Sequence, residues 1–131
     1  MNKNIVAVSV GSNINPNENI AKAKQFLSEQ HTLLLESDFV ITKPIDHSDQ
    51  PDFTNGAFLL ETNLSFEDFN AILKSLETRC GRKPTANKHA PRTLDLDIVV
   101  WNNQITNNQD YQRDFIKTAI QQLLPTLNEN R

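Results

Sequence analysis

Hydrophobic and polar residues follow two periods along the chain, and each period predicts one type of element. Runs of aliphatic, β-branched and aromatic residues bounded by turn-forming residues predict strands at 5–10, 33–42, 53–61 and 94–101. Apolar residues spaced three and four apart predict helices at 16–29, 66–80 and 115–124. Because helices fall between strands, this order predicts an α+β fold with an antiparallel sheet packed against helices.

Residues that start and stop helices support these boundaries. Asn15 followed by Pro16 predicts a helix N-cap and a proline at the first helical position. Ser65 lies three residues before Asp68, in a pattern that resembles a capping box. Gly81 follows the apolar face of the second helix and predicts its C-terminal end.

Two aspartates stand out in the last predicted strand. The two-residue period places Asp95 and Asp97 on one face, while Leu94, Leu96 and Ile98 point into a core on the other. Carboxylates roughly 7 Å apart along a strand repel each other. We therefore expect either charge to be removable with the fold intact or slightly more stable. Mg²⁺ would also offset the repulsion, whereas the plain alternative is a pair of surface aspartates.

Basic residues directly before this strand favour the metal interpretation. They are Arg82, Lys83, Lys88, His89 and Arg92. Arginine and lysine are strong phosphate ligands, so cations for a polyphosphate and carboxylates for a metal occur in one short segment. The segment lacks the glycine-rich Gly-x-x-x-x-Gly-Lys pattern, which excludes a P-loop nucleotide site.

Composition limits the class of protein. A chain of 131 residues with 37% hydrophobic residues predicts one domain, 1–131, with a modest core. A net charge of -3 argues against nucleic acid or an anionic membrane as partner. The chain has one cysteine, Cys80, and it begins with a strand instead of a signal peptide. These features favour the cytoplasm, and we expect a monomer.

Two predicted loops carry polar residues that suit a binding site. Residues 43–52 are polar and flanked by prolines, and residues 81–93 are basic. Glu77 lies on the edge of an apolar helix face just before the second loop. From the residues alone, Glu77 is expected to extend its carboxylate into solvent.

Two segments make the chain recognisable. Residues 90–99 read Ala-Pro-Arg-Thr-Leu-Asp-Leu-Asp-Ile-Val, and residues 49–55 read Asp-Gln-Pro-Asp-Phe-Thr-Asn. Both resemble motifs of the 6-hydroxymethyl-7,8-dihydropterin pyrophosphokinase family, which transfers a pyrophosphoryl group from ATP to a pterin alcohol in folate biosynthesis. The resemblance implies a ferredoxin-like fold with two long catalytic loops, before the third and the fourth predicted strands.

The resemblance also implies roles for individual residues. The implied pterin contacts are Gly11, Thr42, Ile45, Phe53, Asn55 and Phe115. The implied nucleotide contacts are Glu77, Arg82, Lys88, His89, Arg92, Ile98, Tyr111 and Arg113. Asp95 and Asp97 would hold Mg²⁺, and Arg82 and Arg92 would join them as catalytic residues. Phe115 has a second interpretation, as a core residue at helical spacing.

Some positions depart from the family pattern. Relatives carry arginine at Pro84, tryptophan at His89 and often proline at Lys43, and they have a Pro-His segment that is missing from residues 106–112. These differences predict weaker ATP binding and leave three hypotheses open. The chain is a Mg²⁺-dependent pyrophosphokinase, a pterin-binding homologue with weak or lost kinase activity, or a ferredoxin-like interaction module.

Overall fold

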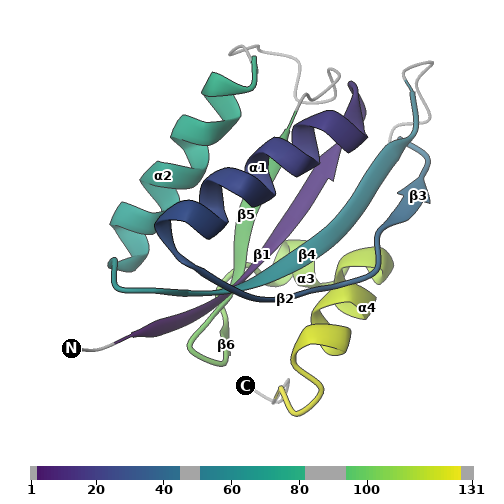
Figure 1. The fold of residues 1–131 in the computed structure, drawn as a ribbon. Coiled ribbons are helices and arrows are strands. Elements are labelled where there is room, and N and C mark those ends of the chain that lie inside the picture. The colour runs from purple at the N-terminus through teal and green to yellow at the C-terminus, as the bar shows by residue number, and fades with distance from the viewer. Residues whose placement is uncertain (1–2, 45–50, 82–93, 128–131) are drawn as a thin grey trace.

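A computed structural model describes residues 3–44, 51–81 and 94–127 (Figure 1). Its elements follow the predicted order, with three additions. They are β1 (Asn4–Ser12), α1 (Pro16–Gln30), β2 (Thr32–Glu36), β3 (Val40–Thr42), β4 (Phe53–Thr62), α2 (Phe66–Arg79), β5 (Asp95–Trp101), β6 (Gln104–Ile105), α3 (Asn108–Tyr111) and α4 (Asp114–Leu123).

The described strands form one antiparallel sheet in the order β2-β4-β1-β5-β6, and β3 also pairs with β4. Helix α1 connects β1 to β2, and α2 connects β4 to β5, so each helix carries the chain between strands that are not neighbours. This connectivity is the β-α-β-β-α-β pattern of ferredoxin-like folds. The predicted α+β architecture is therefore confirmed.

Helices cover both faces of the sheet (Figure 1). Helices α1 and α2 pack on one face, where the core includes Val8, Leu27, Phe58, Phe69 and Leu96. Helix α4 packs on the other face, where the core includes Ala7, Leu59, Val99, Tyr111 and Ile120. Full burial of a large apolar side chain contributes about 1.5–3 kcal/mol. The two cores therefore fix the sheet from both sides.

Two of the three predicted helix ends have the expected geometry. The Ser65 hydroxyl accepts a hydrogen bond from the Asp68 amide at 3.1 Å, and Gly81 adopts a φ of 97°. Asn15 is the N-cap residue of α1 and Pro16 its first helical residue, as predicted, but Asn15 has a φ of 43° and its side chain makes no capping hydrogen bond. Asn19 Nδ2 instead donates to the Ile14 carbonyl at 2.6 Å, which holds the turn before α1.

The predicted strand at 33–42 is divided into β2 and β3. Ser37 interrupts it, because its amide donates to the Ala57 carbonyl at 2.9 Å while its hydroxyl accepts from the Ala57 amide at 2.8 Å. The side chain thus replaces a backbone acceptor and changes the course of the strand. Phe39 follows and lies against Gly56, where an added Cβ would come within 2.7 Å of the ring.

The end of β5 contains a bulge and a tight hairpin that sequence patterns did not predict. The register with β1 shifts between Ala7 and Val8, which leaves Val99 as an extra residue and places Val99 and Val100 in the same core. Asn102 and Asn103 then adopt φ values of 49° and 67°. Positive φ at two adjacent residues makes the tight turn that leads into β6.

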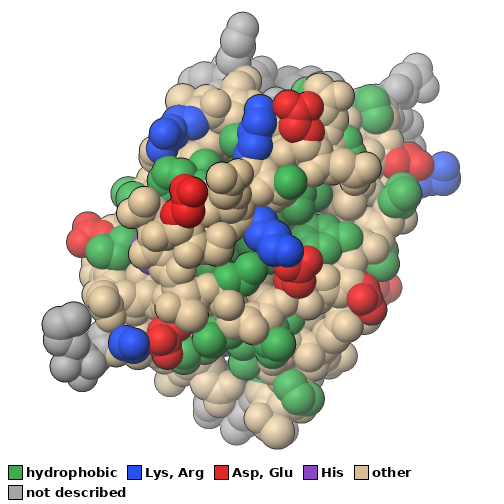
Figure 2. All heavy atoms as spheres, viewed as in Figure 1, with side chains coloured by type: hydrophobic (Ala, Val, Ile, Leu, Met, Phe, Trp, Pro, Cys, Tyr) green, Lys and Arg blue, Asp and Glu red, His purple; other side chains and the backbone are tan. Residues whose placement is uncertain are grey.

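Charged side chains of both signs are interspersed on the face that carries α1 and α2, so this face has no extended patch of one charge (Figure 2).

No helix within 3–44, 51–81 and 94–127 is long and apolar enough to span a membrane. Cys80 is partly buried against the α1 and α2 core.

Candidate functional site

Three strands bring the predicted pterin and metal residues onto one face of the sheet. Gly11 on β1 pairs with Asn55 on β4 and with Asp95 on β5. The next row on this face contains Ser9, which pairs with Asp97. Paired residues share a face, and neighbouring strands lie about 4.8 Å apart. Asn55 and Asp95 therefore lie on either side of a glycine, two strands apart.

Gly11 provides the space that Asn55 occupies. A Cβ added at Gly11 would lie 2.6 Å from Asn55 Oδ1. Asn55 Nδ2 donates to Thr42 Oγ1 at 2.6 Å, which fixes the orientation of the amide from β3. An oriented amide offers a fixed donor and acceptor pattern to a heterocycle edge. Three of the predicted pterin residues thus form one contact group.

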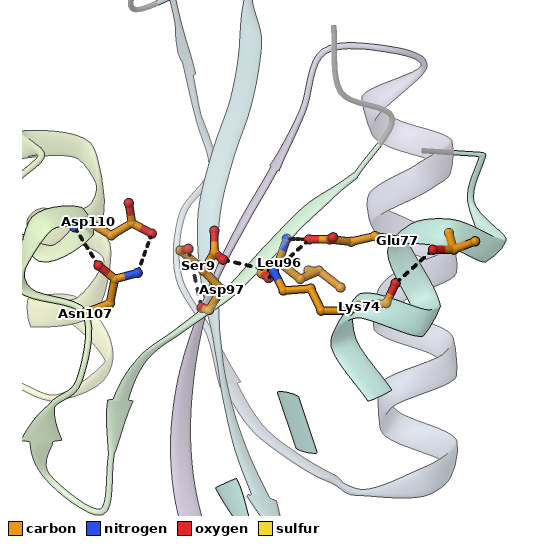
Figure 3. A network of polar contacts seen from close by, with 8 residues as sticks. Ser9, Lys74, Glu77, Leu96, Asp97, Asn107 and Asp110 are labelled. Atoms are coloured by element: carbon orange, nitrogen blue, oxygen red, sulfur yellow. Dashed lines mark hydrogen bonds and ion pairs between the residues drawn. The ribbon is translucent and has the colours of Figure 1, made fainter. Parts of the chain in front are cut away.

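Asp97 is bonded to a lysine that sequence analysis did not single out (Figure 3). Lys74 Nζ lies 3.0 Å from Asp97 Oδ1, 3.3 Å from Glu77 Oε2 and 2.7 Å from the Leu96 carbonyl oxygen. Burial alone would lower the pKa of Lys74, but the charges of Asp97 and Glu77 together raise it above its ordinary value. Lys74 is therefore protonated, and its positive charge lies beside Leu96 and Asp97, near the N-terminal end of β5.

Glu77 is a buried residue, so the expectation that its carboxylate extends into solvent is wrong. Its side chain is 5% exposed, and Oε2 accepts a hydrogen bond from the Leu96 amide at 2.7 Å. Lys74 donates to the carbonyl of the same residue, Leu96. In the described part of the chain, β6 pairs with Val100 and Trp101 and not with Leu96, so these two α2 side chains bind an edge of β5 that no described strand covers.

A third carboxylate lies within electrostatic reach of the two aspartates. Burial raises the pKa of Asp110, and the charges of Asp97 and Asp95 also act in that direction, while Arg113 opposes them. Asp110 accepts a hydrogen bond from Asn107 Nδ2 at 3.2 Å and lies 3.7 Å from Arg113. Helix α3 thus contributes the negative charge of Asp110, which interacts electrostatically with Asp95 and Asp97 in β5 (Figure 3).

Other predicted residues occupy known positions on the same scaffold. Tyr111 is 1% exposed and belongs to the core beneath α4, a position that favours packing over direct contact with a nucleotide. Phe115 packs against that core and is only partly buried, so both of its interpretations stay open. Ile98 is buried in the opposite core, and Phe53 begins β4 as a partly exposed residue.

Five predicted residues lie outside the described parts of the chain. They are Ile45, Arg82, Lys88, His89 and Arg92. They belong to the two segments that carry the expected catalytic loops, so their roles stay predictions.

Comparison with known proteins extends over nearly the whole chain. A family model described as 7,8-dihydro-6-hydroxymethylpterin-pyrophosphokinase (HPPK) matches residues 7–125. The chain belongs to the HPPK family. A 2-amino-4-hydroxy-6-hydroxymethyldihydropteridine pyrophosphokinase of Helicobacter pylori is 32% identical over 92% of this chain and 83% of its own length.

Other relatives differ more in length. The Haemophilus influenzae protein of the same name is 37% identical over 78% of this chain, which spans 65% of that relative. A "Folate synthesis bifunctional protein" of Arabidopsis thaliana is 28% identical over 92% of this chain, which spans 27% of that relative. The matching region is thus found both as a short protein and within a longer one.

The aspartates of this HPPK chain have the donor chemistry that magnesium requires. Asp95 and Asp97 are partly exposed on one face of β5, and hard carboxylate oxygens suit Mg²⁺. Within the described ranges, no group of three or more His, Cys, Asp and Glu side chains could hold a metal. Mg²⁺ commonly takes one or two carboxylates and completes its shell with water and phosphate oxygens. The two aspartates fit that mode.

Sequence reasoning missed two features of the HPPK scaffold around Asp97. Lys74 and Glu77 lie three residues apart on α2, a spacing at which opposite charges meet on a helix, and this signal was available. The Ser9 hydroxyl lies 3.5 Å from the Asp97 carbonyl oxygen, a contact between strands distant in sequence. Only knowledge of the register reveals that contact.

Proposed function

We propose that this HPPK chain transfers a pyrophosphoryl group from ATP to 6-hydroxymethyl-7,8-dihydropterin, in the folate pathway. The observation that carries the proposal is the family match over residues 7–125. The names of the Helicobacter and Arabidopsis relatives support the reaction and the pathway. The proximity of Asn55 and Asp95 on one sheet face supports a site that takes both substrates. The single cysteine supports a cytosolic location.

The proposed reaction is a displacement at the β-phosphorus of ATP. The hydroxymethyl oxygen of the pterin forms a bond to that phosphorus, and the bond to the oxygen shared with the α-phosphate breaks. AMP leaves, and the hydroxyl proton passes to solvent. Such a reaction is catalysed mainly by positioning and by neutralising charge on the phosphates.

The proposed roles divide between the strands and the loops. We propose that Asn55 hydrogen-bonds to the edge of the pterin ring, with its amide oriented by Thr42 and given space by Gly11. Phe53 and Phe115 would stack on the faces of the ring. Ile45 completes the proposed pterin contacts.

On the nucleotide side, Asp95 and Asp97 would hold Mg²⁺, which when bound neutralises phosphate charge. Arg82 and Arg92 are proposed to bind the transferred group, as bidentate phosphate ligands. The further proposed nucleotide contacts are Lys88, His89 and Arg113. Glu77, Ile98 and Tyr111 are buried, and we propose that they support the nucleotide site by packing and by hydrogen bonds to the backbone.

Calorimetric titration tests the proposal at the level of binding. We expect 6-hydroxymethyl-7,8-dihydropterin to bind without ATP or metal, and a non-hydrolysable ATP analogue to bind only with Mg²⁺. Asn55→Ala should weaken pterin binding by about 1–3 kcal/mol, because polar groups of the ligand lose their partners. The matched control is Asn70→Ala, because Asn70 lies on α2, away from Gly11, Asn55 and Asp95.

The outcomes separate the three hypotheses. Absence of pterin binding at millimolar concentration would contradict both the kinase and the pterin-binding protein and would leave the interaction module. Pterin binding without any turnover of ATP at saturating Mg²⁺ would favour the binding protein. Weak ATP binding combined with turnover would agree with the expected effect of Pro84, His89 and the short 106–112 segment.

A further inference from the structure

Lys74 lies where a cation would meet Asp97. Its ammonium group bonds to Asp97 Oδ1 at 3.0 Å and to the Leu96 carbonyl oxygen at 2.7 Å (Figure 3). The Lys74 side chain is 43% exposed and that of Asp97 is 31% exposed, so both can exchange partners with solvent. Glu77, by contrast, is 5% exposed and bonded to the backbone of β5, which makes it a fixed anchor.

The positions of these charges oppose a divalent cation on Asp97. A Mg²⁺ ion binds a carboxylate oxygen at about 2.1 Å, so it and the Lys74 ammonium would be two positive charges on one small carboxylate. Their repulsion weakens metal binding unless the ammonium moves away or additional negative charge arrives. The phosphates of a nucleotide supply such charge. Lys74 therefore acts against the metal alone more than against the metal bound to a polyphosphate.

We propose that Lys74 is a positioning residue that serves as the resident cation of Asp97, neutralising this carboxylate before Mg²⁺ binds and lowering the affinity of the protein for Mg²⁺ without nucleotide. This inference rests on the proposed metal-binding role of Asp97. Under this inference α2 supplies, through Lys74, the positive charge that neutralises Asp97 before the metal binds. Magnesium then enters the site together with the polyphosphate in preference to entering it alone.

Lys74→Gln is the variant that separates charge from hydrogen bonding. Glutamine can still donate to the Leu96 carbonyl but carries no charge. Calorimetric titration with Mg²⁺ alone, at low ionic strength, should show about tenfold tighter binding for Lys74→Gln than for the unmodified protein, after allowance for screening. Lys74→Arg keeps the charge and should bind Mg²⁺ like the unmodified protein.

Lys3→Gln is the control for net charge. Lys3 pairs with Glu61 at 3.4 Å beside the first residues of β1, whereas Asp97 pairs with Ser9 further along that strand. Lys3→Gln should therefore leave the Mg²⁺ affinity unchanged, although it changes the net charge by the same amount.

Thermal melting provides a readout that does not depend on activity. Without metal, Lys74→Gln should melt at a lower temperature than the unmodified protein, and added Mg²⁺ should raise its melting temperature by the larger amount. A lysine with only a structural role would lower the melting temperature but leave its response to Mg²⁺ unchanged, and that result would overturn the proposal. Equal or weaker Mg²⁺ binding by a folded Lys74→Gln protein would also overturn it.

Failure of this inference can be distinguished from failure of the proposed function. If Lys74→Gln and the unmodified protein bind Mg²⁺ equally and both transfer pyrophosphate, only the role of Lys74 is wrong. If neither protein binds Mg²⁺ with or without a nucleotide, the metal-binding role of Asp97 is wrong and the inference falls with it.

Discussion

Asp95 and Asp97 share a face of β5, and Asp97 has an ion pair with a residue of α2. Asp97 is bonded to Lys74, so its negative charge is compensated within the folded protein. The expectation that removing either charge would leave stability unchanged or improved took only mutual repulsion into account. For Asp97 that expectation is incomplete. Removing its charge relieves the repulsion from Asp95 but also breaks the ion pair with Lys74, which lowers stability.

Asparagine substitutions at the two aspartates should therefore separate activity from stability. Asp95→Asn and Asp97→Asn should each abolish pyrophosphoryl transfer, since both remove a proposed metal ligand. Asp97→Asn should also lower the free energy of unfolding by up to about 1 kcal/mol, the range of a partly exposed ion pair. For Asp95→Asn we expect unchanged or slightly higher stability, because the substitution relieves the repulsion between the two carboxylates. Urea unfolding without Mg²⁺ measures both, and a large loss of stability at Asp95 would indicate a structural role there.

Asp110 makes a prediction that depends on pH. Burial and the charges of Asp97 and Asp95 raise its pKa in the folded protein above the unfolded value. Above the raised pKa the folded state carries the full penalty of the charged form, and below the unfolded pKa that penalty disappears. Stability therefore falls as the pH rises between the two values.

Asp110→Asn should accordingly raise the melting temperature at pH 7, with the gain fading toward about pH 4 or below, where the carboxyl group is protonated in both states. Melting curves across this range test it. A destabilised variant at pH 7 would mean that the ion pair with Arg113, at 3.7 Å, outweighs burial.

At the scale of elements, local signals predicted several helix ends and strand faces that depend on neighbours in sequence. The Ser65 cap, the Gly81 helix end and the alternation of Leu94 and Leu96 with Asp95 and Asp97 all have the expected outcome. The Ser37 interruption was missed, because a hydroxyl that replaces a backbone acceptor depends on Ala57, twenty residues away.

The connection between α2 and β5 was also missed, and Glu77 tests it. Glu77→Ala should lower the free energy of unfolding by about 1–3 kcal/mol, because the buried Leu96 amide loses its acceptor. Ser75→Ala on the exposed side of the same helix is the matched control and should change little. Chemical denaturation measures both. Equal stability of the two variants would show that Glu77 does not connect α2 to β5.

At the scale of the molecule, the order of elements was enough to predict the α+β class, and two motifs were enough to predict the family. The arrangement of the site was less accessible. Sequence analysis assigned Gly11, Asn55 and Asp95 to one site through resemblance, but their common row appears only when β1 is paired with β4 and β5. Sequence analysis did not single out Lys74, whose partners Leu96 and Asp97 lie more than twenty residues away.

The central claim concerns the group that is transferred, and the identity of the nucleotide product tests it most directly. The protein is incubated with ATP, Mg²⁺ and 6-hydroxymethyl-7,8-dihydropterin, and the nucleotides are separated and quantified, with Asp95→Asn as the inactive control. The account predicts AMP in a one-to-one ratio with the pterin diphosphate, and no AMP when the pterin is omitted. Formation of ADP with a pterin monophosphate, or no pterin product from a protein that binds both substrates, would contradict it.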